Sequence, residues 1–284
     1  MGHKLLSEPI RKYIHKKRWE KLRPIQSSAI EKITTTDKNY ILASRTASGK
    51  TEAAFLPILS KTDFNEVGVQ VLYISPLIAL INDQFFRIED LCKDLEVSVT
   101  KWHGEAKRSL KKNLIKKPNG VVLITPESVE AMFVNAPYNA ITLFGNLKYI
   151  VIDEIHSFLG VDRGLQLMSL LSRLQQINKK RIITIGLSAT IGKENYLEAK
   201  RLTGNIENTT VLLDNAKKET EAKFRYFRTS ATELSLNFLK DLYKETATNK
   251  VLVFPNNRGR AEEIAVKLRK ISDRVNGHKH YYSH

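Results

Sequence analysis

One segment combines a small-residue loop with a lysine and a hydroxyl, and together these groups can hold phosphate. Residues 44–51 read Ser-Arg-Thr-Ala-Ser-Gly-Lys-Thr, between an apolar run and a helical pattern. Main-chain N–H groups of such a loop, and of the helix after it, point at phosphates. Lys50 would reach the β and γ phosphates of a nucleotide, and the Thr51 hydroxyl would bind Mg²⁺. We expect the phosphates to be surrounded by Thr46, Ala47, Ser48, Gly49, Lys50 and Thr51.

This loop departs from the usual phosphate-binding pattern in two places. Ser44 stands where the first glycine is expected, and Ala47 stands where many such loops carry glycine. Both side chains are small, so the main chain can still approach a phosphate, although a left-handed backbone there would be strained. The alternative interpretation is an ordinary turn between a strand and a helix that contains Gly-Lys-Thr by chance.

Two adjacent carboxylates follow a second apolar run, in the segment Ile-Val-Ile-Asp-Glu-Ile-His at residues 150–156. In open α/β sheets, the carboxyl ends of the strands form the ligand site. Asp153 is therefore predicted to bind Mg²⁺, and Glu154 to position or deprotonate the attacking water. A solvated acidic turn after a strand is the alternative.

The chain is strongly basic. Of its 284 residues, 46 are Lys or Arg and 30 are Asp or Glu, which gives a formal net charge of +16. A surplus of this size favours a polyanionic partner, because phosphate contacts release counterions. We expect a nucleic acid as partner, either RNA or DNA. A basic protein without such a partner is the alternative.

Cysteine content and hydropathy bear on the compartment. Cys92 is the only cysteine, which excludes an internal disulfide and a thiolate metal cluster. No apolar run approaches the roughly 18 to 20 residues that cross a bilayer, and the first residues contain no apolar run long enough for a signal peptide. We expect a soluble, cytoplasmic protein with no membrane partner.

The elements that must position these groups alternate along the chain. Short apolar runs, rich in β-branched residues, are separated by segments with helical periodicity. This alternation predicts an α/β fold with a parallel sheet covered by helices on both faces. The expected strands are 40–43, 69–75, 97–101, 120–125, 147–153 and 181–187, and the expected helices include 77–92, 107–115 and 164–177.

The alternation loosens after residue 191, and residues 200–222 are mostly polar. A helix around 231–246, a strand over 250–254 and a basic helix over 258–270 are then expected, as at the start of a second α/β domain. We predict a first domain at 1–214, a linker at 215–230 and an incomplete second domain at 231–284, because such a domain usually needs about 100 residues.

The order of the motifs resembles superfamily 2 helicases of the DExH-box type. The phosphate loop, Asp-Glu-Ile-His and then Ser-Ala-Thr at 188–190 follow one another as in that family. Arg-Pro-Ile-Gln is similar to its glutamine motif, 75–84 to motif Ia, 125–128 to motif Ib and 249–263 to motif IV. Trp-His-Gly at 102–104 and Arg-Gly-Leu-Gln-Leu at 163–167 are similar to the large helicase-related group. The resemblance implies a RecA-like P-loop domain that binds and hydrolyses ATP.

The resemblance also implies contacts with adenine and with nucleic acid. Gln26 would read the adenine edge, with Arg23 in the same motif, because an amide offers the donor and acceptor that adenine requires. Without its neighbours, Gln26 would be interpreted as a surface glutamine. Packing is the alternative for Trp102, and a solvated helix face for the basic residues at 101–117. The implied nucleic-acid contacts are Pro76, Leu77, Gln84, Trp102, His103, Gly104, Thr125, Pro126 and Glu127.

Three further residues are candidates for coupling the two sites. Ser188 and Thr190 are hydroxyls at a strand end that could link the carboxylates to the far side of the cleft, or could cap the next helix instead. His156 could bridge phosphate chemistry to the nucleic-acid side through its two ring nitrogens, or could be a histidine with ordinary partners. The expected catalytic residues are Glu154, Lys50, Asp153 and His156.

The expected function is an ATP-dependent helicase or translocase motor. Members of the family complete their ATP site with arginines from a second domain, and no Gln-x-x-Gly-Arg-x-Gly-Arg segment occurs in this chain. We expect the chain alone to bind ATP and nucleic acid but to hydrolyse ATP slowly, and a second motor domain or partner protein to complete the site. The alternative is a binding module without catalysis. A P-loop kinase or GTPase is disfavoured, because no lid or Asn-Lys-x-Asp segment is present.

Overall fold

The chain forms two compact units, Met1–Lys217 and Lys218–His284. The computed structural model describes residues 2–45, 48–189, 191–214, 222–228, 234–278 and 280–283. The boundary between the units falls inside the range 215–230 that the sequence predicts as a linker.

The first unit is built on one parallel sheet. Its strands are β1 (Asn39–Ala43), β2 (Val71–Ile74), β3 (Val99–Trp102), β4 (Val121–Ile124), β5 (Tyr149–Ile152), β6 (Ile183–Ser188) and β7 (Thr209–Leu213). They lie in the order β3-β4-β2-β5-β6-β1-β7, and each neighbouring pair is parallel. The carboxyl ends of all seven strands therefore meet at one edge of the sheet, which is where the predicted site residues follow their strands.

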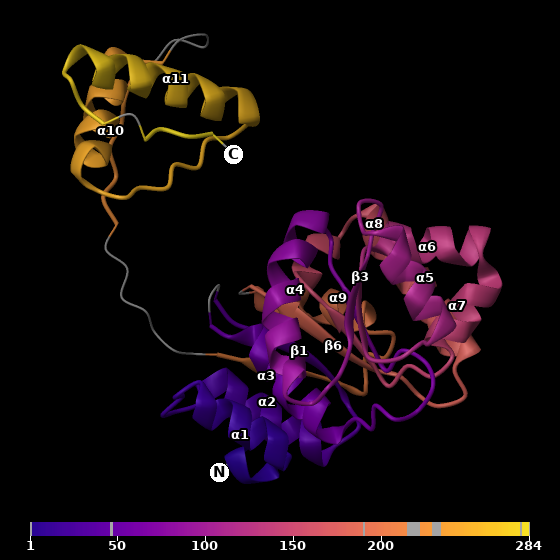
Figure 1. Cartoon of the computed structure of the whole chain (residues 1–284). Helices are drawn as coiled ribbons and strands as arrows, with labels where there is room; N and C mark the ends of the chain where they lie inside the picture. Colours follow the sequence, from indigo (N-terminus) through magenta and orange to yellow (C-terminus); the bar gives the residue numbers. More distant parts are fainter. Residues whose placement is uncertain are drawn as a thin grey trace. The chain divides into compact units, whose positions relative to one another are not determined.

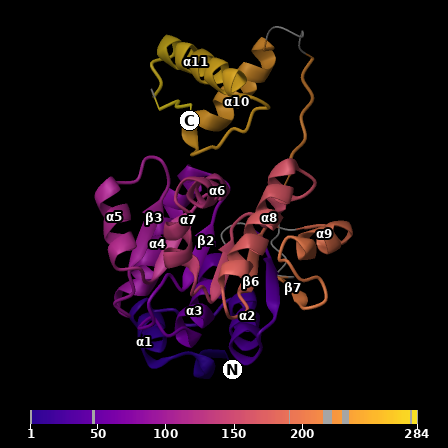
Figure 2. The ribbon, with the colours of Figure 1, turned by 90° about the vertical axis from the view of Figure 1, so that its right-hand side faces the viewer.

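Helices cover both faces of this sheet, as predicted (Figure 1). One face packs against α1 (Glu8–Lys16), α2 (Pro24–Thr35), α3 (Lys50–Lys61) and α4 (Ile78–Lys93). Helices α5 (Arg108–Lys116), α6 (Pro126–Asn135), α7 (Pro137–Phe144), α8 (Asp162–Ile177) and α9 (Tyr196–Arg201) contribute to the core of the other face. Figure 2 looks onto the face covered by α6, α7 and α8. Among the helices described, none has the length and apolarity needed to cross a membrane.

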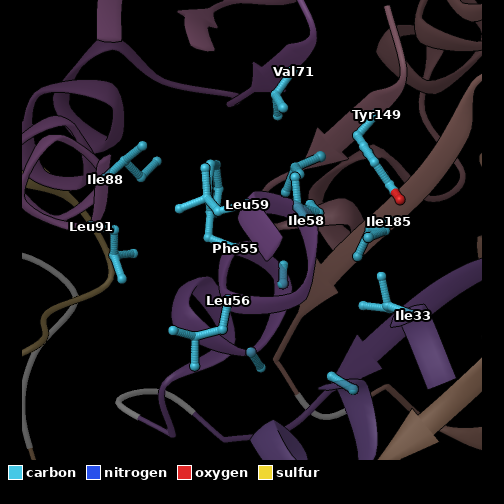
Figure 3. Packing of buried hydrophobic residues seen from close by; sticks show 14 of the residues in the cluster. Ile33, Phe55, Leu56, Ile58, Leu59, Val71, Ile88, Leu91, Tyr149 and Ile185 are labelled. Carbon is cyan, nitrogen blue, oxygen red and sulfur yellow. The ribbon is translucent and has the colours of Figure 1, made fainter. Parts of the chain in front are cut away.

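Alternation along the buried strands supplies two hydrophobic cores. Leu42 and Tyr73 belong to the core under α1–α4, whereas their neighbours Ile41 and Ile74 belong to the core on the opposite face. Figure 3 shows part of the first core, where Phe55 of α3 lies among aliphatic side chains from the helices and strands around it. A fully buried aliphatic side chain of this kind contributes about 1.5–3 kcal/mol. Strands β2, β4 and β5 are buried on both faces, which explains why they lack a polar side.

The edge strand β7 was not predicted from the sequence. It lies in the polar region 200–222 and pairs with β1 alone, from Asn39–Thr209 to Ala43–Leu213. A strand with one neighbour needs only a short run of β-branched and apolar residues, and Thr-Thr-Val-Leu-Leu is such a run. Its weak signal follows from its position at the margin of the sheet.

The second unit contains α10 (Leu236–Thr248) and α11 (Arg258–Arg274), close to the two helices expected there. The strand predicted over 250–254 is wrong: these residues are irregular, with Leu252 83% and Phe254 87% exposed. No strand is present in the described part of this unit. A β-strand forms only against a neighbour that pairs with its main chain, so an apolar run without a partner stays unpaired.

Candidate functional site

The order of the strands separates the predicted site residues into two neighbouring groups. The phosphate loop follows β1, Ser188 ends β6 and Asp153 follows β5, and these three strands are adjacent. The next strands along the sheet are β2, β4 and β3, which are followed by Pro76 and Thr125 and by the segment that begins at His103. Strand β5, with its two carboxylates, lies at the junction between the groups.

The phosphate loop closes tightly onto the start of α3. Gly49 has a left-handed backbone (φ +81°), and a Cβ at this position would lie 2.5 Å from Gln26 Nε2. Any other residue would therefore be strained and would collide with the glutamine. The Ser44 and Ser48 hydroxyls are 2.5 Å apart and hydrogen-bonded, so the serine in place of the usual glycine connects the two ends of the loop. Thr46 and Ala47 lie outside the described residues.

Lys50 lies in the electrostatic field of the two carboxylates. The Lys50 ammonium donates to the main-chain oxygens of Ser44 (2.9 Å) and Arg45 (3.0 Å) at the mouth of the loop. Burial lowers the pKa of Lys50, and the charges of Glu154 and Asp153 oppose that shift. The lysine is thus close enough to both acids to interact with them electrostatically.

Asp153 is a buried carboxylate, 6% exposed, at the end of β5. Its Oδ1 accepts from the Glu154 N–H at 3.0 Å. Burial raises the pKa of Asp153, while the Tyr73 hydroxyl, the Glu154 N–H and Lys50 act in the opposite direction. The Tyr73 hydroxyl is itself buried and makes no hydrogen bond of ordinary geometry with the described residues. A cation beside Asp153 would offset the cost of burying its charge.

Glu154 turns the chain away from the sheet. Its backbone is left-handed (φ 44°, ψ 46°), which is unusual for a residue with a side chain, and it precedes the 3-10 helix η2 (Ile155–Phe158). His156 Nδ1 lies 3.1 Å from Ser188 Oγ and 3.3 Å from Glu154 Oε2. The histidine therefore connects the acidic segment to the end of β6. Thr190 lies outside the described residues.

Gln26 is buried against the phosphate loop, 4% exposed. Its Oε1 accepts from the Arg23 N–H at 3.0 Å, and its Nε2 donates to the Gly49 carbonyl at 3.4 Å. The interpretation of Gln26 as a surface glutamine is therefore excluded. The Arg23 side chain is exposed beside it.

Two side-chain contacts connect helix α3, close after the phosphate loop, to helix α4. Thr51 Oγ1 donates to Gln84 Oε1 at 3.0 Å, and Arg87 forms an ion pair with Glu52 at 2.7 Å. Gln84 was expected at the nucleic-acid contact, and that role stays a prediction. Its amide oxygen nevertheless lies against the predicted magnesium ligand, which sequence reasoning did not anticipate.

The second group of residues lies where α4 and α6 begin. Pro76 is buried, and Leu77 is exposed immediately before the first turn of α4. Thr125 caps α6, with its hydroxyl accepting from the Ser128 N–H at 3.3 Å. Pro126 is the first residue of α6, and the side chain of Glu127 is exposed. Two helix N-termini therefore lie at the ends of the adjacent strands β2 and β4, and such termini attract anions.

Arg163 was recognised only as part of a motif, and the structure gives it three contacts. Its Nε donates to Glu127 Oε1 at 2.8 Å, and its Nη2 donates to the Pro76 carbonyl, also at 2.8 Å. The guanidinium lies 5.4 Å from the centre of the Phe158 ring. This arginine therefore connects the starts of α4 and α6 to η2. Its place in the Arg-Gly-Leu-Gln-Leu motif was the one signal in the sequence.

The Trp-His-Gly segment extends the same edge beyond β3. Trp102 packs partly into the core, and the Lys111 ammonium lies 5.5 Å from its ring centre. His103 is 3% exposed, yet neither ring nitrogen has a hydrogen-bond partner among the described residues. Burial lowers the pKa of His103, and Lys101 and Lys111 lower it further. Gly104 is exposed, with open space where a side chain would begin.

Several basic side chains surround this segment. Lys101 and Lys111 are held locally, by hydrogen bonds to Asn82 Oδ1 (2.9 Å) and to the His103 carbonyl (2.6 Å). The others are exposed and form no ion pair with the described residues: Lys107, Arg108, Lys112, Lys116 and Lys117. Cations that form no ion pair remain available to an anionic ligand.

Known proteins resemble this chain in sequence and in fold. The family model for DEAD/DEAH box helicases matches residues 23–199. The ATP-dependent helicase Lhr-Core of Methanocaldococcus jannaschii is 33% identical over 95% of this chain and 34% of its own length. The same-named protein of Sulfolobus acidocaldarius is 30% identical over 92% of this chain and 32% of its own length.

Among solved structures, the Mycobacterium smegmatis helicase Lhr bound to ssDNA and AMP-PNP has a TM-score of 0.79 and 26% identity. It covers 95% of this chain, which covers 36% of it. The helicase MrfA has a TM-score of 0.78 at 23% identity, with 95% of this chain and 38% of MrfA covered, a likeness of fold. The chain thus spans about a third of the length of the curated relatives. The match over residues 23–199, on a RecA-like sheet with both groups of motifs at one edge, shows that the chain belongs to the DEAD/DEAH box helicase family.

Proposed function

We propose that this chain is the ATP-binding motor unit of a nucleic-acid helicase or translocase. It binds Mg·ATP and single-stranded nucleic acid and couples ATP hydrolysis to strand movement. The observation that carries the proposal is the strand order. Strands β1, β6 and β5 bring the phosphate loop, the histidine link and the two acids together, and the adjacent β2, β4 and β3 carry the nucleic-acid segments. One rigid sheet then positions both ligands.

The nucleotide binds at the start of α3. Main-chain N–H groups of the loop and of the helix N-terminus receive the phosphates. The Lys50 ammonium, held by two main-chain carbonyls at the mouth of the loop, turns to the β and γ phosphates. Gln26 reads the adenine edge, supported by its burial against Gly49 and by the Arg23 N–H that orients its amide.

The residues present fit a magnesium ion. Mg²⁺ takes oxygen ligands and usually needs only one or two protein groups beside the phosphates and water. Thr51 and Asp153 would supply them, and Asp153 is a buried carboxylate whose pKa is raised by burial, so a cation beside it would offset that cost. When bound, the ion neutralises charge on the phosphates. No group of three or more His, Cys, Asp or Glu side chains fit for another metal occurs among the described residues.

Hydrolysis depends on Glu154 and His156. Glu154 projects from a turn at the end of β5 and positions the attacking water or accepts its proton. His156 Nδ1 lies within reach of both the Glu154 carboxylate (3.3 Å) and the Ser188 hydroxyl of β6 (3.1 Å). A change at the γ phosphate would reach the neighbouring strand through this contact. Thr190 is proposed to take part with Ser188.

Nucleic acid binds along the starts of α4 and α6 and the segment after β3. Phosphates bind at the helix N-termini, at Leu77 for α4 and at Thr125 and Pro126 for α6. The Glu127 carboxylate is paired with Arg163, which offsets its negative charge at this site. His103 is proposed to take part, because its two ring nitrogens are buried and have no hydrogen-bond partner among the described residues. The exposed lysines and arginine of α5 supply the attraction at longer range.

The test separates the two groups of residues. Lys50→Ala should weaken the binding of a fluorescent ATP analogue at least tenfold, because a hydrogen bond to a charged group contributes about 1.5–3 kcal/mol. It should leave binding of a single-stranded oligonucleotide, measured by anisotropy without nucleotide, within about twofold. Gly104→Glu places a negative charge at an open, exposed position. This variant should weaken binding of the oligonucleotide and leave binding of the ATP analogue unchanged. If both variants weaken both ligands, or neither, the division of the sheet edge into two sites is refuted.

Turnover distinguishes a motor from a binding module. ATP hydrolysis is measured with single-stranded DNA, single-stranded RNA and duplexes, with Glu154→Gln as control. A motor shows hydrolysis that nucleic acid stimulates, even at the low rate expected of this chain alone, and Glu154→Gln abolishes this hydrolysis while ATP binding is retained. Equal turnover in the two proteins, with intact ATP binding, would favour the module.

A further inference from the structure

We propose that Gln84 positions the Thr51 hydroxyl for Mg²⁺ and thereby links the metal site to α4. The inference deepens the proposed function and rests on it. It starts from one contact: Thr51 Oγ1 lies 3.0 Å from Gln84 Oε1. Thr51 is a buried residue in the first turn of α3, and Gln84 lies in the second turn of α4, 33 residues further along the chain.

The direction of this hydrogen bond follows from the neighbours of the amide. Gln84 Nε2 donates to Asp83 Oδ2 at 3.3 Å, which directs the NH₂ group toward the carboxylate. The oxygen therefore faces Thr51, and an amide oxygen can only accept. The hydroxyl has a single proton, and that proton is committed to Gln84.

A metal ligand must present a lone pair. A hydroxyl carries one proton and two lone pairs, and it rotates freely when nothing fixes the proton. With its proton held by Gln84, the Thr51 oxygen keeps its lone pairs turned away from α4. Without that acceptor the hydroxyl would rotate freely until the metal binds. Fixing it at that point costs entropy, which reduces the metal's contribution to nucleotide affinity.

A second contact keeps the two helices in register. Glu52, next to Thr51, forms an ion pair with Arg87, which lies one turn after Gln84. The Glu52 side chain is only 13% exposed, so this pair is screened less than a surface pair. Helix α4 begins after the exposed Leu77 at the proposed nucleic-acid edge. Displacement of α4 by a bound strand would therefore move Gln84 relative to Thr51.

The experiment measures the effect of magnesium on affinity, which needs no catalysis. Fluorescent N-methylanthraniloyl-ADP is titrated into the chain in Mg²⁺ and in EDTA. The readout is the dissociation constant in EDTA divided by the dissociation constant in Mg²⁺, which is large when the metal strengthens binding. Gln84→Met keeps the size of the side chain but removes the acceptor. It should lower the ratio by up to about tenfold, the effect of one hydrogen bond between neutral groups, while the affinity in EDTA stays within about twofold.

Three further variants sharpen the result. Gln84→Glu retains an acceptor oxygen and should keep the wild-type ratio. Glu89→Met changes an exposed residue of the same helix and should leave the ratio unchanged. In a Thr51→Ala background, which has no hydroxyl, Gln84→Met should add nothing. If Gln84→Met does not fold, Gln84→Asn, one methylene shorter, takes its place.

The outcomes distinguish this inference from the function it rests on. A wild-type ratio in Gln84→Met, or an equal loss of affinity with and without Mg²⁺, overturns the positioning role alone. A wild-type chain that binds nucleotide equally well in Mg²⁺ and in EDTA also overturns the positioning role alone. A wild-type chain that binds no nucleotide overturns both proposals.

Discussion

The left-handed backbone at Glu154 allows a prediction about stability that is independent of catalysis. At φ 44° and ψ 46°, the side chain at this position crowds the following carbonyl. Glycine has no Cβ and adopts this conformation without strain. We therefore expect Glu154→Gly to be more stable than Glu154→Ala, although both lack the carboxylate and both lose the contact with His156. The comparison isolates the backbone.

The size of the effect follows from two opposing contributions. A residue with a side chain costs about 1–2 kcal/mol in the left-handed region. Glycine in turn lowers the free energy of unfolding by about 0.5–1 kcal/mol, because its backbone has more conformational freedom in the unfolded chain. The free energy of unfolding should be higher in the glycine variant by about 1 kcal/mol. For a unit of this size, that difference corresponds to about 2–4 °C in Tm.

Tryptophan fluorescence during urea or thermal unfolding measures this difference in the first unit alone. The chain has two tryptophans, Trp19 and Trp102, and both belong to that unit. The same pair of substitutions at Glu89, exposed in α4, is the control. There the backbone is helical, so alanine should be the more stable by about 1 kcal/mol. If alanine were also the more stable at position 154, the strain assigned to Glu154 would be refuted.

Three other predictions concern the same site. Burial raises the pKa of Asp153, so the folded chain holds this proton at pH values where the unfolded chain, near 3.8, has lost it. The ionised carboxylate then costs stability, and stability falls as pH rises through that window. Asp153→Asn should raise the Tm in EDTA at pH 7, and the gain should shrink toward pH 4; a gain independent of pH would contradict this. In Gly186→Ala, the new Cβ would lie 2.7 Å from Ile155 Cδ1, so we expect a loss of about 1–3 kcal/mol in urea unfolding. Adding Ile155→Val should recover part of it, and an unchanged loss would show that the collision is not the cause. Finally, Gln26→Glu exchanges the amide donor for an acceptor, and the ratio of GTP to ATP dissociation constants should fall about tenfold; an unchanged ratio would separate Gln26 from adenine.

Much of the first unit could be predicted from the sequence, because its signals are local. Buried parallel strands are apolar on both sides, and the runs at 147–153 and 120–125 contain β5 and β4. Helical periodicity placed the helices 77–92 and 164–177 within two residues of α4 and α8. The predicted phosphate loop and the predicted acids at 153–154 could be singled out because small residues, a lysine and carboxylates stand in the order and at the strand ends that this pattern requires.

The tertiary structure decided what depends on neighbours that are distant in the sequence. Periodicity does not specify which strands lie side by side, and so it could not show that β2, β4 and β3 form a group next to β5, β6 and β1. It missed β7 and wrongly predicted a strand at 250–254, because pairing with another main chain, and not apolar character alone, makes a strand. The contacts of Gln84 with Thr51 and of Arg163 with Glu127 join residues 33 and 36 positions apart. Local composition determined which groups can do chemistry here, whereas only the packing of the sheet and its helices determined which of them meet.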